Sequence, residues 1–276
     1  MTRLFAVAVL CTSAVLLVSG GEGRPQVEVR TVEMTHVIRI PLTAVGSQET
    51  SQASGKDSAI LATSPGAAEE LPEGPDGFDI LDDGGILISD PLRNRVVTFD
   101  SQGKLRQSWN IGFAADSIRI LPDGRALIRE ANTGQLHAFD REGKTIPGEV
   151  SPPLDAAQAQ KLTATSGSIS NGKGNSITVH LERVGQSLVS LQGLAVDNTG
   201  KLYVALESTS GELTEGINVN KTVRKYDANG NLLSETTNLP LNYYIPPVDE
   251  LRVRKGKIYQ LMTTSSEVEI NIWDMN

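Results

Sequence analysis

The stretch "GFDILDDGGILISDPLRNRVVTFDSQGKL", residues 77–105, contains the pattern that decides the fold. Apolar, β-favouring residues lie on both sides of a short turn at 82–85, which is made of aspartate and glycine. Because Asp tolerates left-handed backbone and Gly permits it, this turn predicts a β-hairpin. A second turn of the same kind lies at 100–103. The stretch therefore predicts four antiparallel strands joined by tight turns.

The chain repeats this pattern. The Phe99-Asp100 pair with Gly103 recurs 40 residues later, and a Tyr-Asp version lies at 226–230. Four antiparallel strands in every 40 residues or so are the unit of a β-propeller blade, and such blades must stack to bury their faces. Further copies of the strand–turn–strand half lie at 118–128, 193–205 and 250–261.

The first copy resembles an NHL-type repeat, most strongly over 77–146 and more weakly over 191–236. This resemblance implies a propeller fold and no particular activity, because the scaffold hosts many functions. The second copy differs, since Glu130, Asn132 and Gln135 stand where the first has its Asp-x-x-Asn-Arg loop. The residues that carry the resemblance are Asp90, Asn94, Arg95, Phe99, Asp100 and Gly103.

We therefore predict an all-β fold, a β-propeller of five or six four-stranded blades. The last unit lacks a fourth strand, and the strand-like N-terminal stretch 27–42 has no hairpin partner beside it. We expect this stretch to supply the missing strand and so to close the propeller, which removes a sheet edge. The count rises to six if residues 43–70 contain another blade. The predicted blades are 77–110, 115–150, a degenerate 151–190 that opens like a short helix, 191–236 and 248–274.

The N-terminus has the pattern of a secretory signal peptide. Arg3 precedes an apolar run at 4–18, and small residues follow at 19–21. We predict a signal peptide at 1–21 and a single secreted or periplasmic domain at 22–276; the alternative is an uncleaved N-terminal anchor.

Cysteine content and charge exclude several classes of function. Cys11 is the only cysteine in the chain, so removal of the signal excludes disulfides, thiolate catalysis and cysteine-ligated zinc. The net charge of −8 argues against a nucleic-acid partner, and no membrane span is expected after signal cleavage.

Three segments interrupt the repeat: 44–71, 207–221 and 238–249. The first two are interpreted as loop insertions, at 43–71 and 207–221. In an up-and-down blade all three connections emerge at the same end, so we predict that they decorate one face of the propeller. Loops on a rigid scaffold carry function disproportionately. The alternative is that loop length varies here without a functional reason.

Polar residues that enter the inner strands are predicted to meet near the central channel on this face. A ring of carboxylates there can bind a divalent cation through oxygen, or the residues serve only as hydrated turn residues. These candidates are Asp76, Asp116, Gln192 and Asp249. Tyr243 and Tyr244 are candidates for an exposed aromatic contact, because Tyr suits interfaces, or for packing beneath the insertion.

The sequence "LPEGPDGF", residues 71–78, is similar to the Glu-Gly-Pro opening of the SMP-30/gluconolactonase propellers. The resemblance implies that Glu73 binds a catalytic divalent metal. The other ligands of that family lie in Asn-Gly and Asp-Gly pairs, and here the corresponding pairs are Ser117-Ile118 and Gln192-Gly193. The implied ligand set is therefore incomplete.

The leading functional hypothesis is a non-catalytic module without a cofactor, which binds a protein, peptide or glycan on the decorated face. The alternative is a metal-dependent hydrolase of lactones or esters centred on Glu73, with a divalent cation. A third hypothesis is a structural domain of an envelope assembly.

Overall fold

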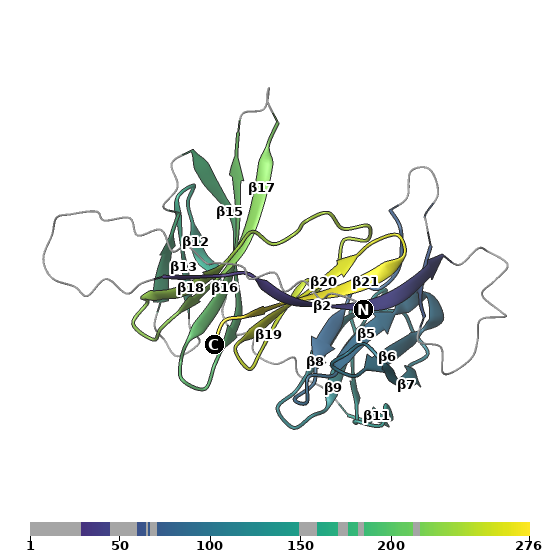
Figure 1. Ribbon diagram of the computed structural model, residues 1–276. Coiled ribbons are helices and arrows are strands. Elements are labelled where there is room, and N and C mark those ends of the chain that lie inside the picture. The colour runs from purple at the N-terminus through teal and green to yellow at the C-terminus, as the bar shows by residue number, and fades with distance from the viewer. Residues whose placement is uncertain are drawn as a thin grey trace, which may run out of the picture.

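The computed structural model describes residues 29–44, 60–64, 66, 71–148, 159–170, 176–181, 185–211 and 216–276. These residues form β-strands, with one turn of 3₁₀-helix, η1 (Pro91–Arg93), among the described segments (Figure 1). No helix in this part of the chain has the length and apolar character needed to cross a membrane. The predicted signal peptide at 1–21 lies outside the described residues.

The strands form five small sheets, each an antiparallel meander at its centre. Sheet 1 contains β4 (Phe78–Ile80), β5 (Ile86–Asp90), β6 (Arg95–Phe99) and β7 (Leu105–Asn110). Sheet 2 contains β8 (Ala115–Ile120), β9 (Ala126–Glu130), β10 (Leu136–Phe139) and β11 (Thr145–Ile146). Sheet 3 contains β12 (Ala159–Leu162), β13 (Ser166–Ser170) and β14 (Ser176–His180).

The remaining two sheets each have a fifth strand. Sheet 4 contains β15 (Gln186–Val196), β16 (Leu202–Ser210), β17 (Asn218–Tyr226), β18 (Leu232–Thr236) and β1 (Arg30–Val32). Sheet 5 contains β19 (Leu251–Arg254), β20 (Lys257–Thr263), β21 (Glu267–Asp274), β2 (Met34–Ala44) and β3 (Leu61–Thr63). This series of up-and-down meanders, one after another along the chain, is propeller-like.

The repeated Asp-x-x-Gly turn has the geometry that its residues predict. The Asp100 carboxylate accepts hydrogen bonds from the backbone N–H groups of Gln102 and Lys104, both at 2.9 Å. These bonds hold the pKa of Asp100 below its ordinary value. Gly103 closes the turn with φ +80°, a left-handed backbone that favours glycine. The same turn recurs at 140–143, 197–200 and 227–230.

The Asp-x-x-Asn-Arg loop of sheet 1 is built around a buried ion pair. The Nε of Arg95 lies 2.7 Å from Asp90, whose side chain is fully buried. Asn94 takes the left-handed conformation at the end of η1, with φ 50°. Asp90 also accepts from the backbone N–H of Ala62, and Arg95 donates to the carbonyl of Ile60. The loop therefore anchors the segment that contains β3.

The N-terminal strand supplies the missing strand of the last sheet. β2 pairs antiparallel with β21, with Ile38 opposite Ile270. This pairing is the one predicted for residues 27–42, whereas closure of the propeller by this strand stays a prediction. β1 continues onto the neighbouring sheet, where it pairs parallel with β18, and β3 pairs parallel with β2.

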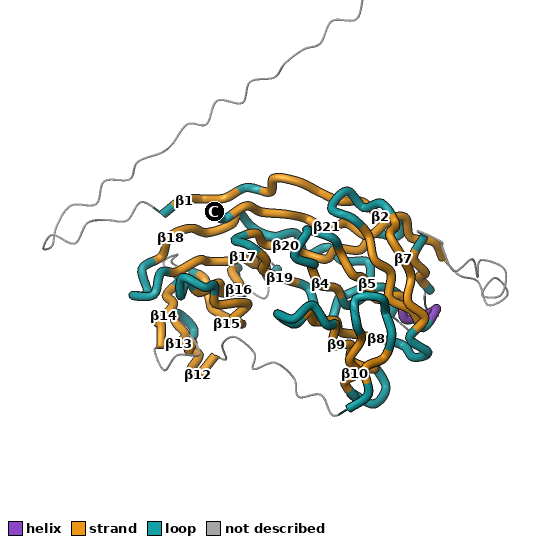
Figure 2. Tube along the Cα trace, turned by 90° about the horizontal axis from the view of Figure 1, so that it is seen from below, coloured by secondary structure: helices purple, strands orange, loops and turns teal. Residues whose placement is uncertain are grey.

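The five sheets lie along an arc in the order 3, 4, 5, 1, 2 (Figure 2). Their first strands lie next to one another on the inner side, where β15 packs against β19, β19 against β4, and β4 against β8. The apolar clusters lie between adjacent sheets: Phe99 and Ile270 belong to the cluster between sheets 1 and 5, and Trp109 and Phe139 to the one between sheets 1 and 2. Residues 149–158, which connect sheets 2 and 3, lie outside the described residues.

One expectation for local structure is wrong. The insertion predicted at 207–221 is an extension of the β16–β17 hairpin, because Glu207 pairs with Lys221 and Ser210 with Asn218. The helix-like opening predicted in 151–162 lies mostly outside the described residues, and its last residues, Ala159–Leu162, form β12. The loop predicted at 43–71 contains β3, and most of its other residues lie outside the described chain.

The segment 237–250 contacts both the β16–β17 hairpin and the residues that lead into β4. The Nδ2 of Asn238 donates to Oδ1 of Asn220 at 3.0 Å, which joins the segment 237–250 to the β16–β17 hairpin. The backbone N–H of Asp249 donates to the carbonyl of Asp76 at 3.1 Å, which joins it to the segment before β4. These segments therefore form one surface, which we call the decorated face; the β16–β17 hairpin rises from it at the top of Figure 1.

Candidate functional site

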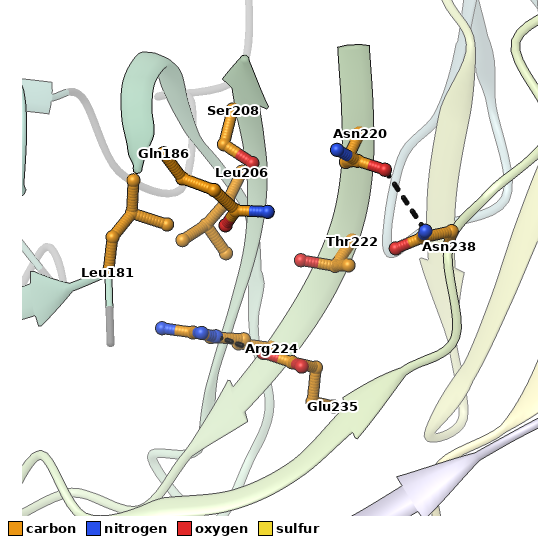
Figure 3. A pocket seen from close by; sticks show the side chains of 9 residues that line it. All are labelled: Leu181, Gln186, Leu206, Ser208, Asn220, Thr222, Arg224, Glu235 and Asn238. Atoms are coloured by element: carbon orange, nitrogen blue, oxygen red, sulfur yellow. Dashed lines mark hydrogen bonds and ion pairs between the residues drawn. The ribbon is translucent and has the colours of Figure 1, made fainter. Parts of the chain in front are cut away.

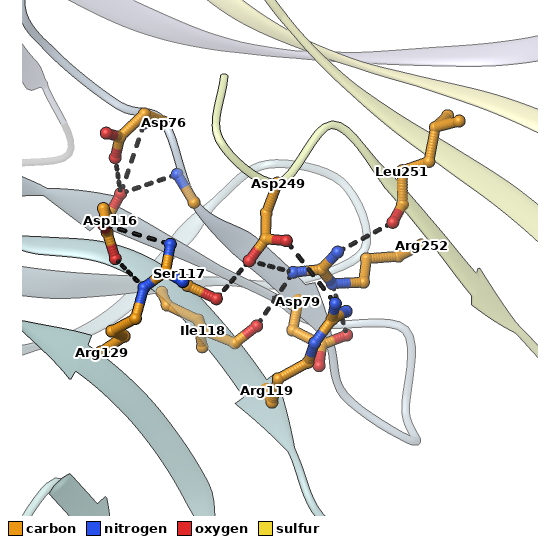
Figure 4. A network of polar contacts seen from close by, with 12 residues as sticks. Asp76, Asp79, Asp116, Ser117, Ile118, Arg119, Arg129, Asp249, Leu251 and Arg252 are labelled. Atoms are coloured by element: carbon orange, nitrogen blue, oxygen red, sulfur yellow. Dashed lines mark hydrogen bonds and ion pairs between the residues drawn. The ribbon is translucent and has the colours of Figure 1, made fainter. Parts of the chain in front are cut away.

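A network of carboxylate and guanidinium groups lies where sheets 1, 2 and 5 meet (Figure 4). Its carboxylates come from β4, from the segments that lead into β4 and β19, and from the start of β8. Its arginines lie on β8, β9 and β19. The members are Asp76, Asp79, Asp116, Ser117, Arg119, Arg129, Asp249 and Arg252. We call them the central network.

Most carboxylates of the central network are paired with arginine. Arg129 contacts Asp116 in bidentate fashion, with Nε and one terminal nitrogen at 2.8 and 3.2 Å from its two oxygens. Asp249 accepts from Arg252 at 2.8 Å and from the Ser117 hydroxyl. Burial raises the pKa of Asp249, but the charges of Arg252 and Arg119 outweigh burial and hold the pKa below its ordinary value. This carboxylate is therefore ionised at neutral pH.

Asp76 is the exception. Its carboxylate accepts a hydrogen bond from the Ser89 hydroxyl at 3.2 Å, and no arginine pairs with it among the described residues. Burial raises the pKa of Asp76 to about 7, against the opposing effect of Ser89, and the nearby charges of Asp116 and Asp249 raise it further. Asp76 thus changes protonation near neutral pH.

The structure brings together three of the four residues that were predicted near the central channel. Asp76, Asp116 and Asp249 are within the central network, whereas Gln192 lies on β15 with an exposed side chain and no hydrogen bond to the network within the described residues. Of the two alternatives left open by the sequence, a carboxylate ring for a divalent cation is disfavoured in this part of the chain, because arginines pair with Asp116 and Asp249. The described residues contain no group of three or more His, Cys, Asp or Glu side chains that can hold a metal ion.

The arginines of this network were missed at the level of sequence. Arg119 and Arg129 stand in predicted strands and were not among the candidate site residues. A signal was present: Arg129 occupies the same place relative to Asp116 that Ser89 occupies relative to Asp76, 40 residues earlier. Aligning the copies against each other would have indicated the pairing.

The two tyrosines are not free for an exposed contact. The Tyr243 hydroxyl donates to Glu250 and accepts from Nε2 of Gln260 at 3.0 Å. Burial, and then the hydrogen bond and charge of Glu250, raise the pKa of Tyr243 above its ordinary range. Lys221 bridges Glu250 and Glu207, the latter at 2.6 Å. Tyr244 packs against the core between sheets 1 and 5.

Glu73 does not lie in a metal-binding arrangement. Its backbone pairs with Ser64 in an isolated bridge, with N–H to O distances of 2.8 and 3.0 Å, and its side chain is exposed. It belongs to no acidic group of the size needed to hold a metal ion within the described residues. The hydrolase hypothesis therefore has no ligand set here.

A polar pocket lies under the extended hairpin of sheet 4 (Figure 3). Its volume is about 30 Å³, which is room for an ordered water but not for a larger ligand. Arg224 crosses its floor, paired with Glu235 and donating to the carbonyl of His180. Its other lining residues are Leu181, Gln186, Leu206, Ser208, Asn220, Thr222 and Asn238.

Exposed aliphatic side chains occur on the three parts of the decorated face and on the adjacent extended end of β15. They include residues from the hairpin, from the segment before β4 and from the segment before β19, each more than half exposed. These residues are Leu71, Val189, Ile217, Val219 and Val248. Apolar side chains exposed on one face favour a contact with another molecule.

Comparisons with known proteins concern the fold only. No protein-family model and no curated protein matches the sequence. Solved structures that are similar include a virginiamycin B lyase from Staphylococcus aureus with quinupristin (9% identity, TM-score 0.37, 86% of this chain and 99% of that chain). BamB from Moraxella catarrhalis (14%, 0.31, 73% and 83%) and the calcium-binding protein regucalcin from Agrobacterium tumefaciens (10%, 0.31, 73% and 91%) are also similar. At these identities and TM-scores the similarity carries no information on activity or ligand.

Proposed function

We propose that this chain is an exported, five-bladed β-propeller that binds a protein or peptide through its decorated face and catalyses no reaction. The observation that carries the proposal is the set of exposed aliphatic side chains on that face. Aliphatic residues favour contact with the apolar groups of a polypeptide, and burying them contributes about 25 cal/mol for each Å² removed from water.

The internal contacts of the face support a binding role. Lys221, Glu250 and Tyr243 hold the hairpin against the segment before β19, and Asp249 holds that segment against Asp76. A surface that is fixed before binding loses less conformational entropy when a partner docks. Among the described residues of this face, the carboxylates of Glu207, Glu250 and Asp249 are paired with arginine, lysine or hydroxyl groups. These pairs favour a role in supporting the surface over a role in general acid–base chemistry.

The test is a selection of peptides from a random displayed library on residues 25–276, followed by calorimetric titration of an enriched peptide. The double variant Ile217→Ser/Val219→Ser removes two exposed aliphatic side chains at the hairpin, and we expect it to weaken binding at least tenfold. Met34→Ser is the matched control. Met34 is also about half exposed, but it lies in sheet 5, where it pairs with Trp273, at the end of the strands that is remote from the decorated face.

Two results would overturn the proposal. One is enrichment of no peptide above the background of the naked support. The other is equal binding by the native protein and the hairpin variant, with both folded by circular dichroism. If the protein binds oligosaccharides from a panel and no peptide, the ligand of the decorated face is a glycan.

A further inference from the structure

The outer edge of β17 is open at its N-terminal end. On its inner side β17 pairs with β16 along its whole length, whereas on its outer side β18 pairs only with residues 224–226. Beyond β18 the chain stays beside β17 as far as Leu239, whose backbone N–H donates to the carbonyl of Lys221 at 2.8 Å. The start of β17 therefore projects past the chain next to it, in the hairpin that rises at the top of Figure 1.

The pairing of β17 shows which backbone groups face this open edge. In an antiparallel strand the N–H and C=O of one residue point to the same edge, and successive residues alternate between the two edges. The carbonyl of Lys221 faces outward, because it accepts from Leu239. The N–H of Val223 also faces outward, since it donates to the Thr236 hydroxyl at 2.9 Å. The N–H and C=O of Val219 and the N–H of Lys221 therefore face the open edge, and within the described residues they have no hydrogen-bond partner.

The open part of the edge has no charged side chain that protects it. Charges on an edge strand discourage another chain from pairing with it. The outer strand of sheet 1, β7, has such a charge in the exposed Arg106, whereas residues 217–220 have the uncharged sequence Ile-Asn-Val-Asn. Ile217 and Val219 are each more than half exposed. Because β-branched residues favour strands, this edge is suited to pairing with a further strand.

Sheet 4 already has a distant segment as an added strand. β1 pairs in parallel with the outer edge of β18, with Thr31 opposite Glu235, although the two lie far apart in the sequence. β1 covers β18 and leaves the open edge of β17 uncovered. An extended polypeptide is the class of molecule whose backbone has donors and acceptors at the spacing of such an edge.

We propose that the partner of the decorated face binds as an extended polypeptide strand added to the open edge of β17, an inference that rests on the proposed function. The added strand exchanges hydrogen bonds with the N–H and C=O of Val219 and accepts one from the N–H of Lys221. Its residue opposite Val219 is aliphatic, because cross-strand neighbours share a face and Val219 is exposed. The residues on either side of it are polar, since they share the other face with Asn218 and Asn220.

The experiment is an N-methyl scan of a peptide that a displayed library enriches on residues 25–276. Each backbone N–H of the peptide is methylated in turn, and the affinity of each peptide is measured by calorimetric titration. Methylation of an N–H that faces β17 removes a hydrogen bond and should weaken binding about tenfold. Methylation of the N–H groups between them should have little effect. The losses should therefore recur at every second residue of the bound segment.

A variant of the protein tests the same hydrogen bonds from the other side. Val219→Pro removes the outward N–H, and an edge strand tolerates proline where its N–H faces solvent. Val219→Ala is the matched control, because it also loses the valine side chain but keeps the N–H. We expect Val219→Pro to bind the peptide about tenfold more weakly than Val219→Ala. Circular dichroism checks that both variants are folded, and the N-methyl scan decides the question if the proline variant is not.

The outcomes distinguish this inference from the proposed function. If Ile217→Ser/Val219→Ser weakens binding but the scan shows no alternation, the peptide binds the decorated face without adding a strand, and this inference is overturned alone. Equal binding by folded Val219→Pro and Val219→Ala has the same meaning. If the library enriches no peptide, both the proposed function and this inference are overturned. Self-association that Val219→Pro abolishes, measured by sedimentation, would make a second copy of this chain the occupant of the edge and would overturn the inference as well.

Discussion

Sheets 1 and 2 are copies of one repeat, 40 residues apart, yet they have different surroundings. Sheet 1 packs against sheet 5 on one side and sheet 2 on the other, and every residue of its central strands β5 and β6 is buried. Sheet 2 packs against sheet 1, and half of β10 is only partly buried. The same turn chemistry and strand pattern therefore produce a fully enclosed sheet in one position and a half-exposed sheet in the other.

The difference is visible residue by residue. Asp90 in sheet 1 is fully buried against Arg95, whereas its counterpart Glu130 in sheet 2 is a quarter exposed and meets His137 at 3.3 Å. The comparison teaches that a repeat specifies the turns and strands, while its neighbours decide which polar residues at equivalent positions contribute to stability.

The largest expected effect tests this contrast directly. Asp90→Ala leaves the buried Arg95 without its partner, and we expect a loss of roughly 3–5 kcal/mol in the free energy of unfolding. Glu130→Ala at the equivalent position should cost less than about 1 kcal/mol, because that pair is partly solvated. Urea unfolding of both variants measures the difference, and equal losses would contradict the comparison.

The contact that joins the two sheets should give the next largest effect. Gly143→Ala places a methyl group against the rigid ring of Trp109 at a residue with φ +79°, and we expect a loss of about 3 kcal/mol. Gly134→Ala is the control, since Gly134 also has a positive φ but open space around it, and it should cost about 1 kcal/mol. Thermal unfolding of the two variants distinguishes steric overlap from backbone strain alone.

The equivalent acids Asp76 and Asp116 should respond in opposite directions. The folded-state pKa of Asp76, about 7, lies above its unfolded value near 3.8, so the folded state binds the additional proton and stability falls as the pH rises from 4 to 7. Asp76→Asn removes this loss, and we expect it to stabilise the protein by roughly 1–3 kcal/mol at pH 8 and little at pH 4.

Asp116→Asn should instead destabilise the protein at pH 8, because Arg129 then loses its bidentate partner. The measurement is the unfolding free energy of the two variants at pH 4 and pH 8. If both variants change the unfolding free energy in the same direction at pH 8, the different partners, Ser89 and Arg129, do not determine how Asp76 and Asp116 contribute to stability.

The smallest expected effect lies on the surface of the enclosed sheet. Arg106→Gln breaks an ion pair with Asp83 in which both side chains are more than a third exposed, so the cost should be below about 0.5 kcal/mol. If Arg106→Gln lowered the unfolding free energy as much as Asp90→Ala, the position of an ion pair in sheet 1, and not its burial, would determine its contribution to stability. Thermal unfolding at two salt concentrations measures the size of this loss and shows whether salt screens the ion pair.

Much of the fold could be predicted because it is encoded locally. The Asp-Gly turns fix their hairpins through backbone geometry, and the spacing of Phe99 and Phe139 reveals the repeat. The pairing of β2 with β21 could also be inferred, since one sheet lacked a strand and one strand lacked a sheet.

The central network and the hairpin extension could be predicted only in part, because they depend on contacts between distant segments. Asp249 is paired by Arg252 on its own segment but also by Ser117, 132 residues away, and no local pattern encodes that contact. The residues 207–221 lack regular alternation in their sequence, and their strand character comes from cross-strand pairs such as Glu207 with Lys221. Tyr243 likewise finds its partner Gln260 on another strand.

The pairing of β2 with β21 has a consequence for how the protein is made. The ribosome produces β2 long before β21, so the most distant strand pair in the described chain is also the last of its strand pairs that can form. Contacts of such high sequence separation slow folding, because the chain must close a long loop before it gains their energy. Until the C-terminal residues arrive, the backbone edges of β2 and β20 are both unpaired and open to association with other chains. We therefore expect a nascent chain, or one truncated before β21, to aggregate more readily than the folded molecule.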